Sequence, residues 1–183
     1  MNTRGQVNTE SGSGPRIAAA LQRLHGTLAG RPGFGHYTGS SVTTLIQGLR
    51  CETEVDGWTI ASDLRPAFGG EGSAPTPSVL LSSALGACLA MGYQLRAAEL
   101  GIELSSVRVT VETDSELCGM LRCDAPAPPG FTEVRYRVEV ESPAGTSDIA
   151  RIIDLADRLS PVLDALTRVN RVQRTVSINE RVA

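Results

Sequence analysis

Residues 69–88 read GGEGSAPTPSVLLSSALGAC, and this stretch decides most of what the sequence says about the fold. Thr76 followed by Pro77 is typical of a helix start, because threonine caps free N–H groups and proline suits the first turn. The helix runs to about Leu100, and its segment 79–93 has no polar face. This segment is shorter than the about 20 apolar residues that a membrane span needs, so we predict a helix that is buried on all sides within the protein.

Hydrophobic periodicity and turn residues predict the elements on either side of this helix. The polar residues 1–14 are expected to form a flexible tail ahead of a single domain spanning 15–183. The predicted elements are a helix at 15–29, a hairpin of strands 41–55 and 58–63 around Asp56-Gly57, strands 102–113 and 131–142, helices 146–159 and 160–167, and a closing strand 172–178.

Composition excludes several classes of protein. The 183 residues suit one domain, the net charge is −3, and all 17 basic residues are arginine, so Schiff-base chemistry and nucleic-acid binding are not expected. Four cysteines occur without a secretory signal, which favours a reducing cytoplasm. With two histidines and no CxxC pair, we expect neither a metal site nor a cofactor, and no membrane association.

The glycine-proline loop and cysteine-bearing helix of residues 69–88 resemble those of the OsmC/Ohr superfamily. Three further landmarks agree in order and spacing: GLRCE at 48–52, AAELGI at 97–102 and SPVLD at 160–164. The resemblance covers roughly residues 30–178. It implies an α+β fold built as an intertwined homodimer, with antiparallel sheets wrapped around long central helices. The apolar helix would then be covered by the second subunit.

The resemblance also implies a chemistry. In active members a cysteine thiolate attacks the O–O bond of an organic hydroperoxide, releases an alcohol and becomes a sulfenic acid. By position that cysteine is Cys88, acting in oxidative-stress defence, and an external thiol would reduce it. Because a free thiol has a pKa of about 8.5, little of it is thiolate at pH 7, so such a cysteine needs a nearby cation to stabilise the charged form. The N-terminus of the helix is about three turns from Cys88, and the effect of the helix dipole fades within the first turn. A side chain must therefore supply the positive charge. Arg50 is the candidate, with Arg65 as the weaker alternative.

Two departures from the family pattern bear on this chemistry. Active members carry an acidic residue just after the proline that starts the helix, where it holds the arginine toward the sulfur; here Ser78 and Val79 stand there. They also carry a second cysteine directly before a late proline, and here that residue is Ser160. A hydroxyl cannot resolve a sulfenic acid, but Ser160 is well suited to cap the following helix.

Two functions therefore stay open at this point. Cys88 is either a single peroxidatic cysteine, resolved by an external thiol or by Cys51, or a small core residue in a non-catalytic dimer that binds a small hydrophobic molecule. Under the second interpretation Arg50 is an ordinary exposed strand residue. Cys118 and Cys123 are interpreted as incidental thiols on or near a hairpin.

Overall fold

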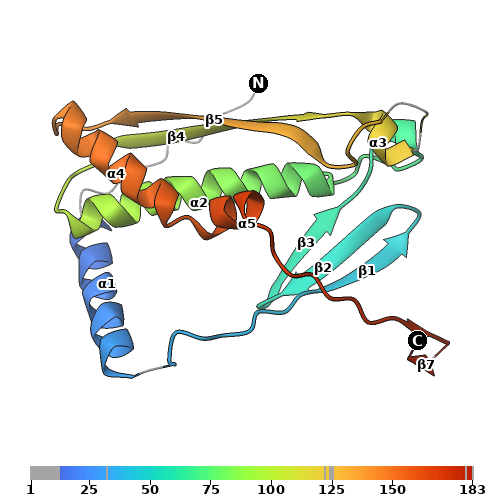
Figure 1. The fold of residues 1–183 in the computed structure, drawn as a ribbon, viewed down its shortest axis with the longest axis horizontal. Helices are drawn as coiled ribbons and strands as arrows, with labels where there is room; N and C mark the ends of the chain where they lie inside the picture. Colours follow the sequence, from blue (N-terminus) through green and yellow to red (C-terminus); the bar gives the residue numbers. More distant parts are fainter. Residues whose placement is uncertain (1–12, 32, 122, 124–125, 180, 183) are drawn as a thin grey trace.

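The computed structural model describes residues 13–31, 33–121, 123, 126–179 and 181–182. The central helix α2 (Pro77–Glu99) lies along an antiparallel ribbon of β4 (Ser106–Ser115) and β5 (Phe131–Glu141), as Figure 1 shows. Helices α4 (Thr146–Arg158) and α5 (Pro161–Thr167) also pack against α2. The predicted α+β class is confirmed.

Two parts of the chain extend away from this layered body. Helix α1 (Ser13–Gly30) projects from the C-terminal end of α2, and the antiparallel sheet β1-β2-β3 lies toward the opposite end (Figure 1). The strands of this sheet are β1 (Val42–Gln47), β2 (Arg50–Val55) and β3 (Trp58–Ser62), and the short helix η1 (Pro66–Phe68) links it to α2. No residue of the three strands is buried.

Helix α2 begins and ends as the sequence predicts. The Thr76 hydroxyl accepts a hydrogen bond from the Val79 N–H at 3.4 Å, and Gly101 adopts a left-handed φ of +67° just beyond the helix. Among the described residues, α2 is the one helix long and apolar enough to cross a membrane. Its packing against β4, α4 and α5 makes it the core helix of this fold.

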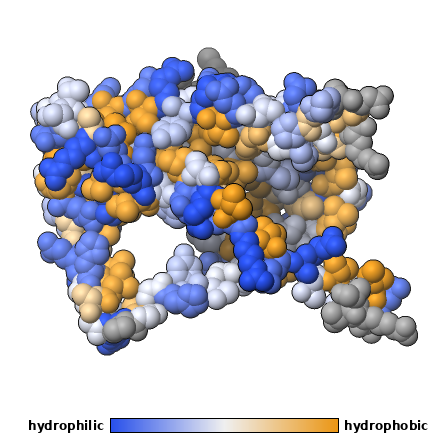
Figure 2. Space-filling view, in the orientation of Figure 1, coloured by the Kyte–Doolittle hydropathy of each residue, from blue (hydrophilic) through white to orange (hydrophobic). Residues whose placement is uncertain are grey.

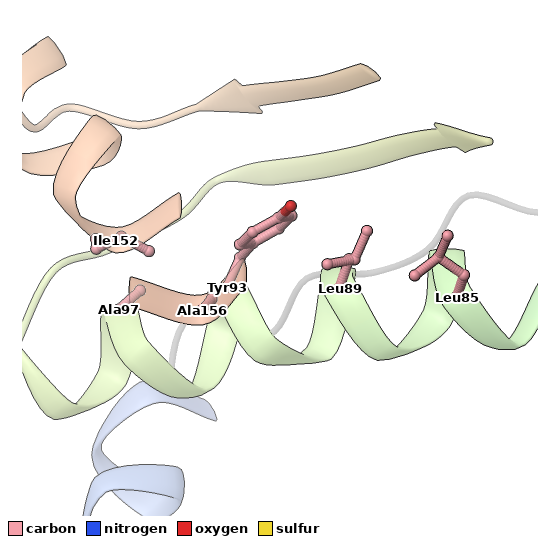
Figure 3. Close-up of a cluster of buried hydrophobic side chains, with 6 residues drawn as sticks. All are labelled: Leu85, Leu89, Tyr93, Ala97, Ile152 and Ala156. Carbon is pink, nitrogen blue, oxygen red and sulfur yellow. The ribbon is translucent and has the colours of Figure 1, made fainter. Parts of the chain in front are cut away.

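The core lies along one side of α2. Its buried side chains recur every fourth residue and point toward the ribbon and α4 (Figure 3); they are Leu85, Leu89, Tyr93 and Ala97, packed with Ile152 and Ala156. The other side exposes apolar side chains, among them Ala87 and Met91, and Figure 2 shows hydrophobic residues, in orange, on the face of the molecule in view. The prediction that α2 is buried on all sides is therefore wrong for a single chain.

The predicted hairpin is confirmed at its turn and wrong in its first strand. Asp56 and Gly57 both have positive φ, which is the conformation of the tight turn expected there. The run 41–55, however, is two strands rather than one, because the chain turns at Gly48-Leu49, where Gly48 has a φ of +56°. The sheet therefore has three strands.

Other boundaries differ from the predictions. The closing strand 172–178 is wrong for most of its length, since only Ser177–Ile178 (β6) is a strand, paired with Arg181–Val182 (β7). Strand β4 starts at Ser106 rather than 102, and α1 starts at Ser13, inside the expected tail; residues 1–12 of that tail lie outside the described residues.

A short helix, α3 (Leu117–Leu121), was missed between β4 and β5. It packs so closely on the following loop that a Cβ at Gly119 would lie 2.2 Å from the Pro128 carbonyl oxygen. Glycine is required at this position because the two backbones are in contact.

Candidate active site

Cys88 lies beside Ser160, which is 72 positions away in the sequence. The Cys88 Sγ and Ser160 Oγ are 3.3 Å apart, with the cysteine half-buried and Ser160 only 4% exposed. Ser160 caps α5 as predicted, accepting a hydrogen bond from the Leu163 N–H at 3.3 Å. Because the hydroxyl accepts from Leu163, its own proton remains available to the sulfur. The Cys88 sulfur therefore has a hydrogen-bonding hydroxyl directly beside it.

The sulfur sits at the boundary between the core and the open side of α2. Cys88 precedes the fully buried Leu89, while its neighbours one turn away on the helix surface, Ala84 and Met91, are both exposed. Among the residues that the structure describes, the thiol is therefore neither sealed by aliphatic side chains nor hydrogen-bonded to a guanidinium.

A half-buried carboxylate fixes the end of α4 that leads to Ser160. Asp157 accepts a hydrogen bond of 2.8 Å from the Tyr93 hydroxyl and another of 2.8 Å from the Tyr136 hydroxyl. Burial, followed by the bond to Asp157, raises the pKa of Tyr136 to about 12 and raises the pKa of Tyr93 even further. The three side chains join α2, β5 and α4 three residues before Ser160.

Arg50 contacts a different part of the chain. Its Nη1 donates to the Ser73 Oγ at 2.8 Å, and its Nη2 lies 3.5 Å from a carboxylate oxygen of Glu52. Among the described residues, no hydrogen bond links Arg50 to Cys88. The predicted pairing of these two residues is therefore not formed inside one chain.

The loop between β3 and α2 is organised by Asp63, which is 2% exposed. Its carboxylate accepts hydrogen bonds from the N–H groups of Leu64, Glu71 and Ser73 and from the Ser73 hydroxyl, at 2.8 to 3.2 Å. These bonds, the Ser73 N–H foremost, hold the pKa of Asp63 below its usual value. An added Cβ at Gly70 would lie 2.0 Å from the Leu64 carbonyl oxygen, so the loop closes tightly around the carboxylate.

Sequence reasoning missed both Asp63 and Ser73. An aspartate at the end of a strand and just before a glycine-rich loop is a recognisable signal for side-chain capping of backbone N–H groups. The signal was present in the sequence at 63–72.

The remaining candidates are dispersed. Arg65 is exposed and precedes η1 with no side-chain capping bond. Cys51 follows Arg50 on β2, so the two side chains point to opposite faces of the sheet. Cys118 and Cys123 lie between β4 and β5, as expected for thiols near a hairpin, and a hydrogen bond that the Cys118 thiol donates to Cys123 raises the pKa of Cys118. All four cysteines are free.

The site is marked neither by a cluster of metal-binding side chains nor by either of two surface hollows. In the described part of the chain, no three His, Cys, Asp or Glu side chains converge on a metal position. Two open hollows of about 460 and 400 Å³ lie along α1 and beside the β1–β3 turns, and neither is lined by Cys88 or Arg50.

Comparison with protein families identifies the family to which this fold and its cysteine-bearing helix belong. A family model described as "OsmC-like protein" matches residues 70–174, which is more than half of the chain, so the protein belongs to the OsmC-like family. No curated protein matches the sequence.

Solved structures of bacterial proteins share the fold at low sequence identity. An OsmC-like protein from Mycoplasma pneumoniae is 21% identical, with a TM-score of 0.61 over 73% of this chain and 89% of that one. An organic hydroperoxide resistance protein OsmC from Legionella pneumophila is 20% identical, with a TM-score of 0.52 and coverage of 72% and 90%. An organic hydroperoxide resistance protein from Elizabethkingia anophelis is 17% identical, with a TM-score of 0.54 and coverage of 73% and 91%.

Proposed function

We propose that this protein is a thiol-dependent hydroperoxide reductase that uses Cys88 as its single peroxidatic cysteine, in oxidative-stress defence. The observation that carries the proposal is the Cys88 sulfur, 3.3 Å from a buried hydroxyl and bordering the open side of α2. Family membership and the hydroperoxide-resistance relatives point to the same chemistry.

The reaction has two halves. The Cys88 thiolate attacks one oxygen of the hydroperoxide, forming an S–O bond as the O–O bond breaks; the leaving alkoxide takes a proton and departs as an alcohol. The sulfenic acid is then attacked by an external thiol, with loss of water, and a second external thiol releases Cys88 from the mixed disulfide. A reducing cytoplasm supplies thiols of this kind.

An external reductant fits better than Cys51. Arg50 and Cys51 are consecutive on β2, so a sheet that presents Arg50 to the sulfur turns Cys51 away from it. Cys118 and Cys123 lie between β4 and β5, away from the Cys88–Ser160 contact, and the raised pKa of Cys118 leaves little thiolate there at neutral pH.

The active site is completed in a homodimer. Within one chain the sheet β1-β2-β3 has no buried residue, and one side of α2 exposes Ala87 and Met91. If the sheet of one subunit covers the open side of α2 in the other, both apolar surfaces leave water. That arrangement also brings Arg50 of one subunit to Cys88 of the other, where a guanidinium stabilises the thiolate.

The test is consumption of an organic hydroperoxide with a dithiol reductant. We expect turnover by the wild type, loss of turnover in Cys88→Ser, and near-normal turnover in Cys51→Ser as the matched control. Trapping with dimedone should label Cys88 before the other three cysteines. Equal turnover in Cys88→Ser and wild type would refute the proposal, as would a Cys88 that stays unlabelled while the other thiols react.

A further inference from the structure

We propose that Ser73 and Asp63 position Arg50, doing from the β3-α2 loop what a carboxylate at position 78 would otherwise do. This inference rests on the proposed function, because Arg50 needs orienting only if it serves the sulfur of Cys88. Neither Ser73 nor Asp63 touches the reacting atoms, so both are positioning residues.

The direction of the hydrogen bonds follows from the donors and acceptors available. Asp63 is ionised at neutral pH and only accepts, so the Ser73 hydroxyl donates its single proton to Asp63 Oδ2 at 2.9 Å. The oxygen of Ser73 is then left with lone pairs, and the Arg50 Nη1 donates to it at 2.8 Å. The chain of bonds runs from Arg50 through Ser73 to a buried negative charge.

The loop makes this arrangement rigid. Asp63 also binds three backbone N–H groups, and these fix the carboxylate before Arg50 is considered. Ser73 contributes one of them through its own backbone at 2.9 Å, so its position does not depend on its hydroxyl. The guanidinium is therefore held by a preformed group and keeps most of its five N–H donors for a thiolate.

Glu52 is the other carboxylate that could orient Arg50. It lies two residues along β2 on the same face as Arg50, but its oxygen is 3.5 Å from Nη2 and its side chain is 41% exposed. An exposed ion pair at this distance constrains a guanidinium weakly. Ser78, at the position where a carboxylate was expected, contacts the Thr76 hydroxyl at 3.2 Å rather than Arg50.

The experiment is a double-mutant cycle on the rate of Cys88 oxidation by an organic hydroperoxide. Ser73→Ala should slow the reaction about tenfold, the scale of one hydrogen bond to a charged group, and move its pH profile to higher pH. In an Arg50→Ala background, Ser73→Ala should cause no further loss. Ser73→Thr, which keeps the hydroxyl, should restore the rate, and Ser78→Ala and Glu52→Gln should stay within about twofold of wild type.

The outcomes separate this inference from the proposed function. If wild-type Cys88 does not react, the proposed function fails and this inference fails with it. If wild type reacts while Ser73→Ala matches it, or if Ser73→Ala slows the Arg50→Ala protein equally, only the positioning role is overturned. Ser73→Ala retains its backbone bond to Asp63, and an unchanged melting temperature confirms that the loop is intact.

Discussion

Ser160 is the residue that sets this chain apart from a two-cysteine peroxidase. Its hydroxyl reaches the sulfur of Cys88 from the position where the family resemblance places a resolving cysteine, while its capping of α5 gives it a structural role as well. A hydroxyl can support the thiolate but cannot form a disulfide with it. Under the proposed function, Cys88 therefore depends on thiols from outside the protein, and its sulfenic acid is open to further oxidation when these thiols are scarce.

Restoring a cysteine should restore internal resolution. In Ser160→Cys we expect hydroperoxide to produce a disulfide between positions 88 and 160, because the two side-chain atoms already lie 3.3 Å apart. Mass spectrometry of unreduced peptides measures it. Overoxidation of Cys88 should fall in the same variant.

The matched control for that variant is Ser160→Ala. Both changes remove the cap of α5, so each should lower the free energy of unfolding by about 1 kcal/mol in the reduced protein. Absence of the crosslink in oxidised Ser160→Cys would show that the two positions are not held together in solution.

At the scale of elements, the Tyr93-Asp157-Tyr136 contact holds α2, β5 and α4 together next to Ser160. The pKa of Tyr136 is raised to about 12, above the value of about 10 for an unfolded tyrosine. The folded state thus favours the neutral phenol. The stabilisation that the neutral Tyr136 side chain gives the folded state is complete below about pH 10 and is lost as the pH rises through about 12.

We therefore expect the urea midpoint of unfolding to fall between about pH 10 and 12, and to fall less in Tyr136→Phe. At pH 7 this variant should be less stable by about 1 kcal/mol, because Asp157 loses a hydrogen bond. Tyr37→Phe is the control, since Tyr37 is 87% exposed. Identical pH dependence of the urea midpoint in wild type, Tyr136→Phe and Tyr37→Phe would show that Tyr136 does not cause the loss of stability at high pH.

Elements with strong local signals were predictable from sequence. Thr76-Pro77 and Gly101 define α2 because capping depends on a few adjacent residues, and Asp56-Gly57 defines a turn for the same reason. Segment 172–178 has strand composition, but a strand needs a partner, and only Ser177–Ile178 is paired.

The site was predictable only in part. Cys88 and the capping role of Ser160 follow from the resemblance and from local pattern, but their contact joins residues 72 positions apart. The link from Asp63 through Ser73 to Arg50 depends on how a loop folds back on itself, which periodicity does not reveal.

The proposed active site needs two copies of the chain. One chain leaves α2 open on one side and the β1–β3 sheet without a buried residue, so a monomer would expose both surfaces to water. Sedimentation should give a dimer at micromolar concentration, with dissociation coupled to unfolding. A stably folded monomer at that concentration would contradict the proposed assembly.

Mixed dimers of Cys88→Ser and Arg50→Ala subunits test whether the two subunits share each active site. Each homodimer lacks one half of every site, so we expect Cys88→Ser to be inactive and Arg50→Ala to be strongly slowed. In the mixed dimer, Arg50 from the first subunit meets Cys88 from the second, giving one intact site of the two. We expect hydroperoxide turnover near half the wild-type rate per dimer. Turnover no higher than that of the Arg50→Ala homodimer would show that the two subunits do not share the site.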